Sequence, residues 1–174
     1  GGALSLVGGE LGNAGNDALT IQGLENVTLE KGSRLFTHFS NLSISDLSGA
    51  LSVEDSTILS NGPLTISGKE GALHLSDGTI QSNSSLNINL GRHLHCHDSH
   101  LNAQQILSLS LGSDLIITGS SLLTSTNGIS LNNKGSLLMD GYSMIKGQGL
   151  SLIVGESTSL NEASKIDGEK GSLS

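Results

Sequence analysis

Leu64-Thr65-Ile66 is one copy of a short apolar–polar–apolar pattern that returns throughout the 174-residue chain. The other copies are Leu19-Thr20-Ile21, Leu42-Ser43-Ile44, Leu86-Asn87-Ile88, Leu107-Ser108-Leu109, Ile129-Ser130-Leu131 and Leu150-Ser151-Leu152. Successive copies begin 23, 22, 22, 21, 22 and 21 residues apart. Alternation with a period of two is typical of a β-strand, and a fixed period of about 20–50 residues is typical of stacked repeats. The sequence therefore predicts a repeat protein built from short strands.

Each repeat holds two further apolar segments after this first strand. The second begins eight or nine residues later, as in Leu73-His74-Leu75. A third apolar position follows seven residues after that, at Ile58, Ile80, Leu101, Leu122 and Met144. Three short strands per coil predict an all-β fold, a single-stranded parallel β-helix (β-solenoid) of about seven to eight coils of 21–23 residues. Leucine-rich repeats share this period, but the extra alternating strand stands where they place a helix or an irregular arm.

Residues 1–174 are expected to form one β-helix domain that is a fragment of a longer chain. Leu4-Ser5-Leu6 is interpreted as the opening copy of the first strand, which makes residues 1–18 a short, irregular first coil. Residues 171–174 begin one more coil, which is cut off. Aromatic residues make up only 2% of the chain, so the core must consist of thin aliphatic layers.

Charge and composition argue against several classes of function. The net charge is −8, and Lys and Arg do not cluster, which disfavours nucleic acid and anionic membrane surfaces as partners. No apolar run approaches the ~18 residues of a transmembrane helix, so we expect no membrane insertion by this segment. A Walker loop, a dinucleotide fingerprint and a G-x-S-x-G motif are all absent. We therefore expect a non-enzymatic chain without a cofactor.

Histidines form the one concentrated group of titratable side chains. His93, His95 and His97 alternate along a predicted strand and should point to the same side, with His74 one coil below His95. Imidazoles at this spacing could share Zn²⁺ or Cu²⁺, but the favoured interpretation is a solvated, pH-sensitive histidine patch, so no metal site is predicted. Alternation sends Cys96 to the opposite side, into the core, so this thiol should not join them.

Residues at the same position of successive coils should form columns on the surface, and three other columns are of interest. Ile116 and Leu138 continue the outward position of His74 and His95, and their adjacency suggests a contact patch. The acidic residues Asp55, Asp77 and Asp98 share a phase that Gly119 and Gly141 continue, which favours a turn role over calcium binding. The polar residue of each first strand forms a hydroxyl-rich face, mostly Ser, whereas an ice-binding face would be expected to hold two columns of Thr.

Segments such as Gly128-Ile129-Ser130-Leu131 and Asn83-Ser84-Ser85-Leu86-Asn87-Ile88 resemble the repeats of bacterial secreted β-helix proteins, the filamentous-haemagglutinin-like exoproteins and autotransporter passengers. Gly1-Gly2-Ala3-Leu4, with Gly49-Ala50-Leu51 and Gly71-Ala72-Leu73, is similar to the Gly-Gly-Ala-Ile/Leu motif of chlamydial polymorphic outer membrane proteins. The resemblance implies a right-handed β-helix, exported to the bacterial cell surface or secreted, that serves as an adhesive stalk.

Three functions follow as hypotheses. The first is an adhesin or passenger segment that presents an extended face to a host-cell surface protein or glycan. The second is a purely structural solenoid that docks to a neighbouring chain of the same assembly. The third is a carbohydrate-active β-helix enzyme, which would need close carboxylates in a cleft.

Overall fold

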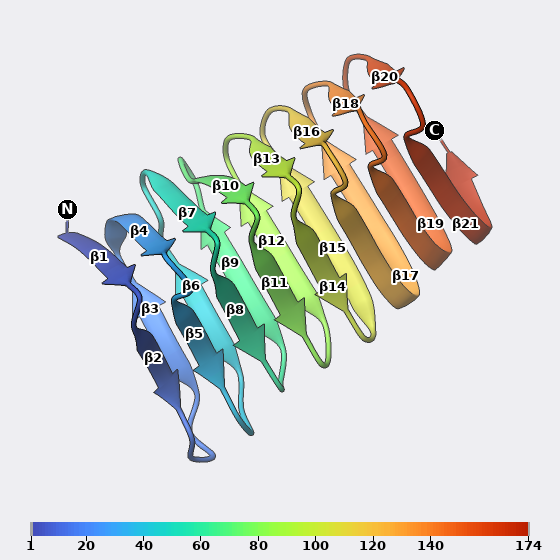
Figure 1. Ribbon diagram of the computed structural model, residues 1–174. Coiled ribbons are helices and arrows are strands. Elements are labelled where there is room, and N and C mark those ends of the chain that lie inside the picture. Colours follow the sequence, from blue (N-terminus) through green and yellow to red (C-terminus); the bar gives the residue numbers. More distant parts are fainter. Residues whose placement is uncertain (1, 174) are drawn as a thin grey trace.

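Stacked coils of parallel β-strands form the whole of the described chain in the computed structural model (Figure 1). The structure describes the backbone of residues 2–173 and the side chains of residues 2–168. Within residues 2–173 there are strands and turns but no helix, so none of the described residues forms a helix that would span a membrane. The fold is a parallel β-solenoid of about eight turns, as the period predicts.

Second strands of successive coils make one eight-stranded parallel sheet. In order along the stack they are β1 (Gly2–Val7), β4 (Leu24–Glu30), β7 (Ala50–Glu54), β10 (Ala72–Ser76), β13 (Leu94–His97), β16 (Leu115–Thr118), β18 (Leu137–Met139) and β20 (Thr158–Leu160).

Third and first strands form the other sheet, which has 13 strands. The third strands are β2 (Glu10–Asn13), β5 (Arg34–Thr37), β8 (Thr57–Ser60), β11 (Thr79–Ser82) and β14 (His100–Ala103). The first strands are β3 (Leu19–Gln22), β6 (Leu42–Ser45), β9 (Leu64–Gly68), β12 (Leu86–Leu90) and β15 (Ile106–Leu111). Further along, one continuous strand combines a third and a first strand in β17 (Leu122–Asn133), β19 (Met144–Val154) and β21 (Lys165–Leu173).

Equivalent residues of neighbouring coils pair directly, so the repeat in sequence becomes a column in space. Leu64 pairs with Leu42 on one side and with Leu86 on the other. Because each inward residue lies against its own copy in the next coil, the aliphatic side chains merge into one continuous core. Leu42, Leu64 and Leu86 are all fully buried there.

Two phase assignments made from the sequence are wrong. Leu4-Ser5-Leu6 pairs with Val27-Thr28-Leu29, so it belongs to a second strand, and β2 and β3 complete its coil with regular pairing to β5 and β6. The opening residues 2–18 are therefore not an irregular coil, and Gly1 lies outside the described residues. At the other end, residues 171–173 pair with residues 150–152 of β19, and Ser174 lies outside the described residues.

The second error concerns the third strand in the later coils. The core residue Leu101 pairs with Leu123, and Leu123 pairs with Ile145. Leu122 and Met144, which the sequence placed in this column, do not belong to it. Leu123 and Ile145 are fully buried, whereas their predecessors face outward and are partly exposed. The turns before these strands contain one more residue than the turn at Asp98, which shifts the alternation by one position.

Candidate functional site

Outward residues of the second strands form what we call the histidine column, which consists of Ser52, His74, His95, Ile116 and Leu138. Backbone pairing places these residues side by side on consecutive strands. All five are partly exposed. Side chains alternate along a strand, so these residues point outward while their neighbours in sequence point into the core. The structure thus confirms that His74 lies beside His95 and that Ile116 and Leu138 continue the same column.

His74 and His93 make the closest contact within the histidine group. The two Nε2 atoms are 3.4 Å apart, and the ring centroids are 4.9 Å apart with the planes inclined at 66°. His74 lies in the middle of β10, whereas His93 occupies the turn just before β13 and therefore reaches across to the neighbouring coil. Sequence spacing grouped His93 with His95 and His97, but this contact joins it to the preceding coil.

The histidines differ in their electrostatic surroundings. Burial, followed by the Coulombic influence of His93 and His95, lowers the pKa of His74. Burial, followed by His97 and His93, also lowers the pKa of His95. Both shifts favour the neutral form of the imidazole, which is the form that carries a free lone pair.

His97 is held by other partners. Its Nδ1 lies 3.0 Å from the Thr118 hydroxyl, and its Nε2 lies 3.2 Å from the Asp98 carboxylate. Among the described residues, no three His, Cys, Asp or Glu side chains come together in a group that could hold a metal ion. Of the four candidate ligands, His74 and His93 are in contact and His95 lies beside His74. His97 contacts Thr118 and Asp98 instead.

Cys96 points away from the histidines, as alternation along β13 predicts. The side chain is fully buried in the aliphatic core, and this burial raises the pKa of its thiol. A thiol that stays protonated is a poor nucleophile and a poor metal ligand. Cys96 is therefore a core residue.

The acidic column has a backbone role. Asp55, Asp77 and Asp98 adopt the left-handed conformation, with φ of 44°, 51° and 46°, and Gly119 and Gly141 adopt it at the equivalent positions. Asp and Gly are the residues that tolerate this conformation best. The pattern supports the turn interpretation for this column.

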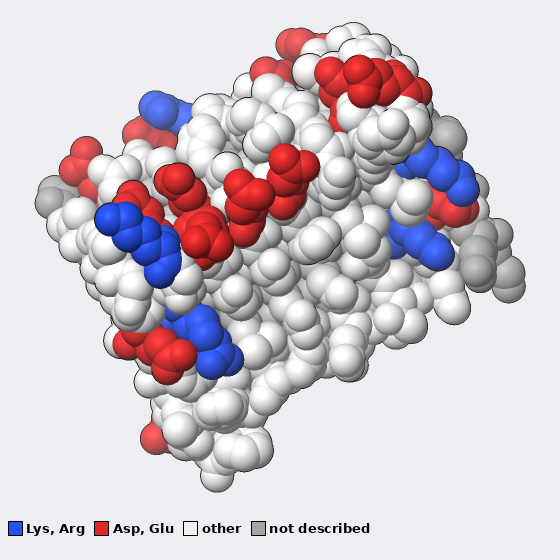
Figure 2. Space-filling model, viewed as in Figure 1, with Lys and Arg blue, Asp and Glu red and all other residues white. Residues whose placement is uncertain are grey.

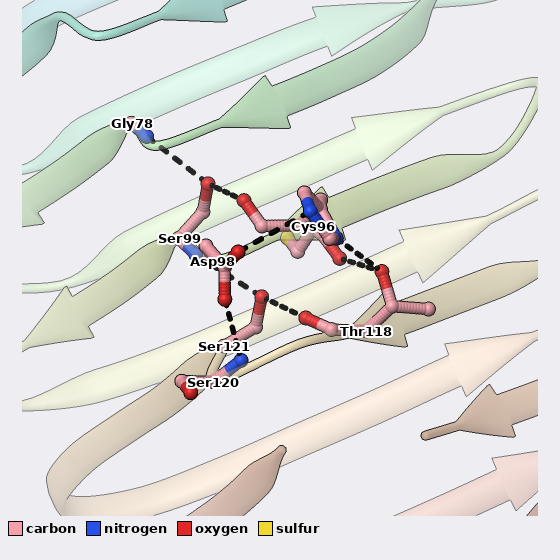
Figure 3. A network of polar contacts seen from close by, with 8 residues as sticks. Gly78, Cys96, Asp98, Ser99, Thr118, Ser120 and Ser121 are labelled. Carbon is pink, nitrogen blue, oxygen red and sulfur yellow. Dashed lines mark hydrogen bonds and ion pairs between the residues drawn. The ribbon is translucent and has the colours of Figure 1, made fainter. Parts of the chain in front are cut away.

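Asp98 also links two coils, as Figure 3 shows. Its Oδ1 accepts a hydrogen bond of 2.8 Å from the Ser120 backbone N–H, 22 residues away. An Asp in a turn commonly accepts a hydrogen bond from a backbone N–H two residues on. The carboxylate bridges to the next coil instead, because the stack places that coil's turn directly beside it.

A buried column of serines follows the acidic column and was not predicted. We call it the serine ladder; its members are Ser33, Ser56, Ser99, Ser121 and Ser143, and Gly78 holds the equivalent position in one coil. The Ser99 hydroxyl accepts from the Gly78 N–H at 3.0 Å, and the Ser121 hydroxyl accepts from the Ser99 N–H at 3.1 Å (Figure 3). A recurrent Ser at a spacing of 21–23 residues was the available signal in the sequence.

Uncharged side chains cover the outward positions of the first strands. We call this the first-strand face. One column holds Thr20, Ser43, Thr65, Asn87, Ser108, Ser130 and Ser151, and the other holds Gln22, Ser45, Ser67, Asn89, Ser110, Asn132 and Ile153. A shallow hollow of about 310 Å³ lies on it between residues 87 and 132. On the side of the molecule shown in Figure 2, a row of acidic side chains crosses the surface, and a large uncharged area lies beneath this row and between the charged side chains near both ends.

Besides a hollow of about 530 Å³ that includes Asp46, Lys69 and Lys134, two further open hollows contain ionisable groups. One of about 510 Å³ is lined by Lys146, Asp167 and polar residues of β14 and β17, and the Asp167 carboxylate accepts a bond of 2.8 Å from the Lys165 ammonium. The other, of about 360 Å³, lies over the histidine column and includes Glu54, His74, His95 and His97. The first contains one carboxylate, where glycoside hydrolysis ordinarily uses two.

Comparison with known proteins gives no match. No family model, curated protein or solved structure matches this chain.

Proposed function

We propose that this chain is a non-catalytic segment of a bacterial cell-surface or secreted adhesin, and that its first-strand face contacts a host-cell surface protein or glycan. The observation that carries the proposal is the absence of charge from both outward columns of that face over seven consecutive coils, in a chain of net charge −8. Thirteen of the fourteen positions carry a hydroxyl or an amide, and the last, Ile153, is apolar; the face is therefore an extended surface of hydroxyl and amide groups. Such groups donate and accept hydrogen bonds without the desolvation cost of ions.

Regular spacing supports contact over length rather than at one point. Neighbouring strands stand about 4.8 Å apart, so seven coils present a ladder roughly 29 Å long from first to last strand. Weak contacts along such a ladder add up when the partner is itself extended or repetitive. The resemblance to secreted β-helix proteins agrees with this use and motivates the bacterial-surface assignment.

The proposal is tested by placing charge on the face. Purified protein should bind host cells saturably, and Thr65→Arg combined with Ser108→Arg should reduce that binding at least about tenfold, since two buried unpaired guanidinium groups would oppose contact. The matched control is Thr79→Arg combined with Asn102→Arg on the third strands. Binding that both variants retain, or that the wild type lacks, would contradict the proposal; docking to another chain without cell binding would favour the scaffold function instead.

A further inference from the structure

The two imidazoles of His74 and His93 lie at hydrogen-bonding distance, and the separation of their nitrogen atoms also suits a metal chelate. Zn–N(His) bonds are about 2.0–2.1 Å long, so two imidazole nitrogens at a tetrahedral angle around one ion stand about 3.3–3.4 Å apart. The two Nε2 atoms are 3.4 Å apart. No movement of the backbone is needed to bring the pair to this separation.

The surroundings leave the pair available to an ion. Both rings are partly exposed, so a metal ion can approach from solvent and complete its coordination with water. Neither side chain makes an ion pair with a described carboxylate, and the nearest acid–histidine contact belongs to His97 and Asp98 instead. The side chains come from neighbouring coils, whose backbones are joined at this point by a hydrogen bond of 3.1 Å from the Leu73 N–H to the His93 carbonyl.

We propose that His74 and His93 form a two-imidazole site for a borderline transition-metal cation, Zn²⁺ or Cu²⁺, with the remaining coordination positions filled by water. Imidazole donors select these ions over Mg²⁺ and Ca²⁺, which prefer oxygen. The site is separate from the first-strand face, because His74 lies on β10 and His93 lies in the turn just before β13. Its function is to bridge coils carrying β10 and β13, so that the bound ion stabilises the middle of the stack.

Metal titration of the intact chain, without an affinity tag, tests the site. Calorimetry at pH 7.5 should show one Zn²⁺ or Cu²⁺ bound per chain and no Mg²⁺ bound. His74→Asn and His93→Asn should each weaken the affinity about tenfold or more, because each removes one of two ligands. The matched controls are His100→Asn, on the adjacent third strand, and His38→Asn, which should leave the affinity unchanged.

Cu²⁺ provides a second readout that does not depend on affinity. Its electron paramagnetic resonance spectrum should show coupling to two imidazole nitrogens in the wild type and to one in either variant. Circular dichroism of the metal-free variants confirms that they are folded. The proposal is overturned if wild-type protein binds neither ion, if both variants bind like the wild type, or if His100→Asn causes the same loss.

Discussion

Cys96 and His95 are neighbours in sequence but lie in opposite environments, because alternation along a single strand decides which side chain enters the core and which faces solvent. The Cys96 side chain is fully buried, and that burial raises its pKa, whereas His95 faces outward beside His74. The sequence predicted both orientations correctly from the pattern Leu94-His95-Cys96 alone. It did not predict the contact between His74 and His93, because His93 lies in a turn where alternation no longer determines direction.

The buried thiol gives a prediction at the same scale. Cys96 in the native protein should not react with a thiol reagent such as Ellman's reagent over hours at pH 8, since the thiolate is disfavoured in the aliphatic core. After denaturation, one thiol per chain should react within minutes. Fast labelling of the native protein would show that Cys96 is accessible and would contradict its place in the core.

Backbone conformation at Asp77 gives a second residue-scale prediction. Its φ of +51° is unfavourable for a residue with a Cβ, at a cost of roughly 1–2 kcal/mol for ordinary residues. Asp77→Ala should therefore lower the free energy of unfolding by about 1 kcal/mol, measured by urea denaturation. Asp77→Gly should cost less, as Gly119 and Gly141 already occupy the equivalent position. Equal losses in the two variants would argue against the turn role.

Register is the property of the elements that the sequence predicted only in part. The first and second strands have clear apolar–polar–apolar patterns, and the pairing of Leu64 with Leu42 and Leu86 confirms their alignment. The third strands carry a weaker signal, so Leu122 was aligned where Leu123 belongs. The cause is that the turn before this third strand is longer than in the preceding coil. An alignment that assumes a constant number of residues between the second and third strands does not detect this difference.

Turns between the first and second strands are packed more tightly than their composition suggests. A Cβ added to Gly112 would stand 2.2 Å from the carbonyl oxygen of Gly91 in the preceding coil. Gly112→Ala should therefore force the two coils apart and lower the free energy of unfolding by about 1–3 kcal/mol, measured by urea denaturation. Gly9→Ala is the matched control, because nothing lies within 4 Å of the added atom, and it should cost well below 1 kcal/mol. The reverse order of the two effects would contradict the close stacking at this turn.

At the scale of the whole molecule, the stack converts a period in the sequence into neighbours in space. Residues 21–23 positions apart become adjacent, while residues half a period apart lie on different strands. The first-strand face, the histidine column and the serine ladder all exist because of this relation. The fold was predictable because one period dominates the sequence. The serine ladder was missed because the recurrence of Ser does not by itself show that the hydroxyls of Ser56, Ser99 and Ser121 accept hydrogen bonds from backbone N–H groups of the preceding coil.

Spin-label spectroscopy tests this relation most directly. Nitroxides attached at Thr65→Cys and Asn87→Cys, 22 residues apart, should show strong spin–spin broadening, because these positions pair on β9 and β12 about 4.8 Å apart. Nitroxides at Thr65→Cys and Ser76→Cys, only 11 residues apart, should show little broadening, since β10 belongs to the other sheet. The buried Cys96 should take no label. Stronger broadening in the second pair than in the first would contradict the stacked-coil account and every surface column derived from it.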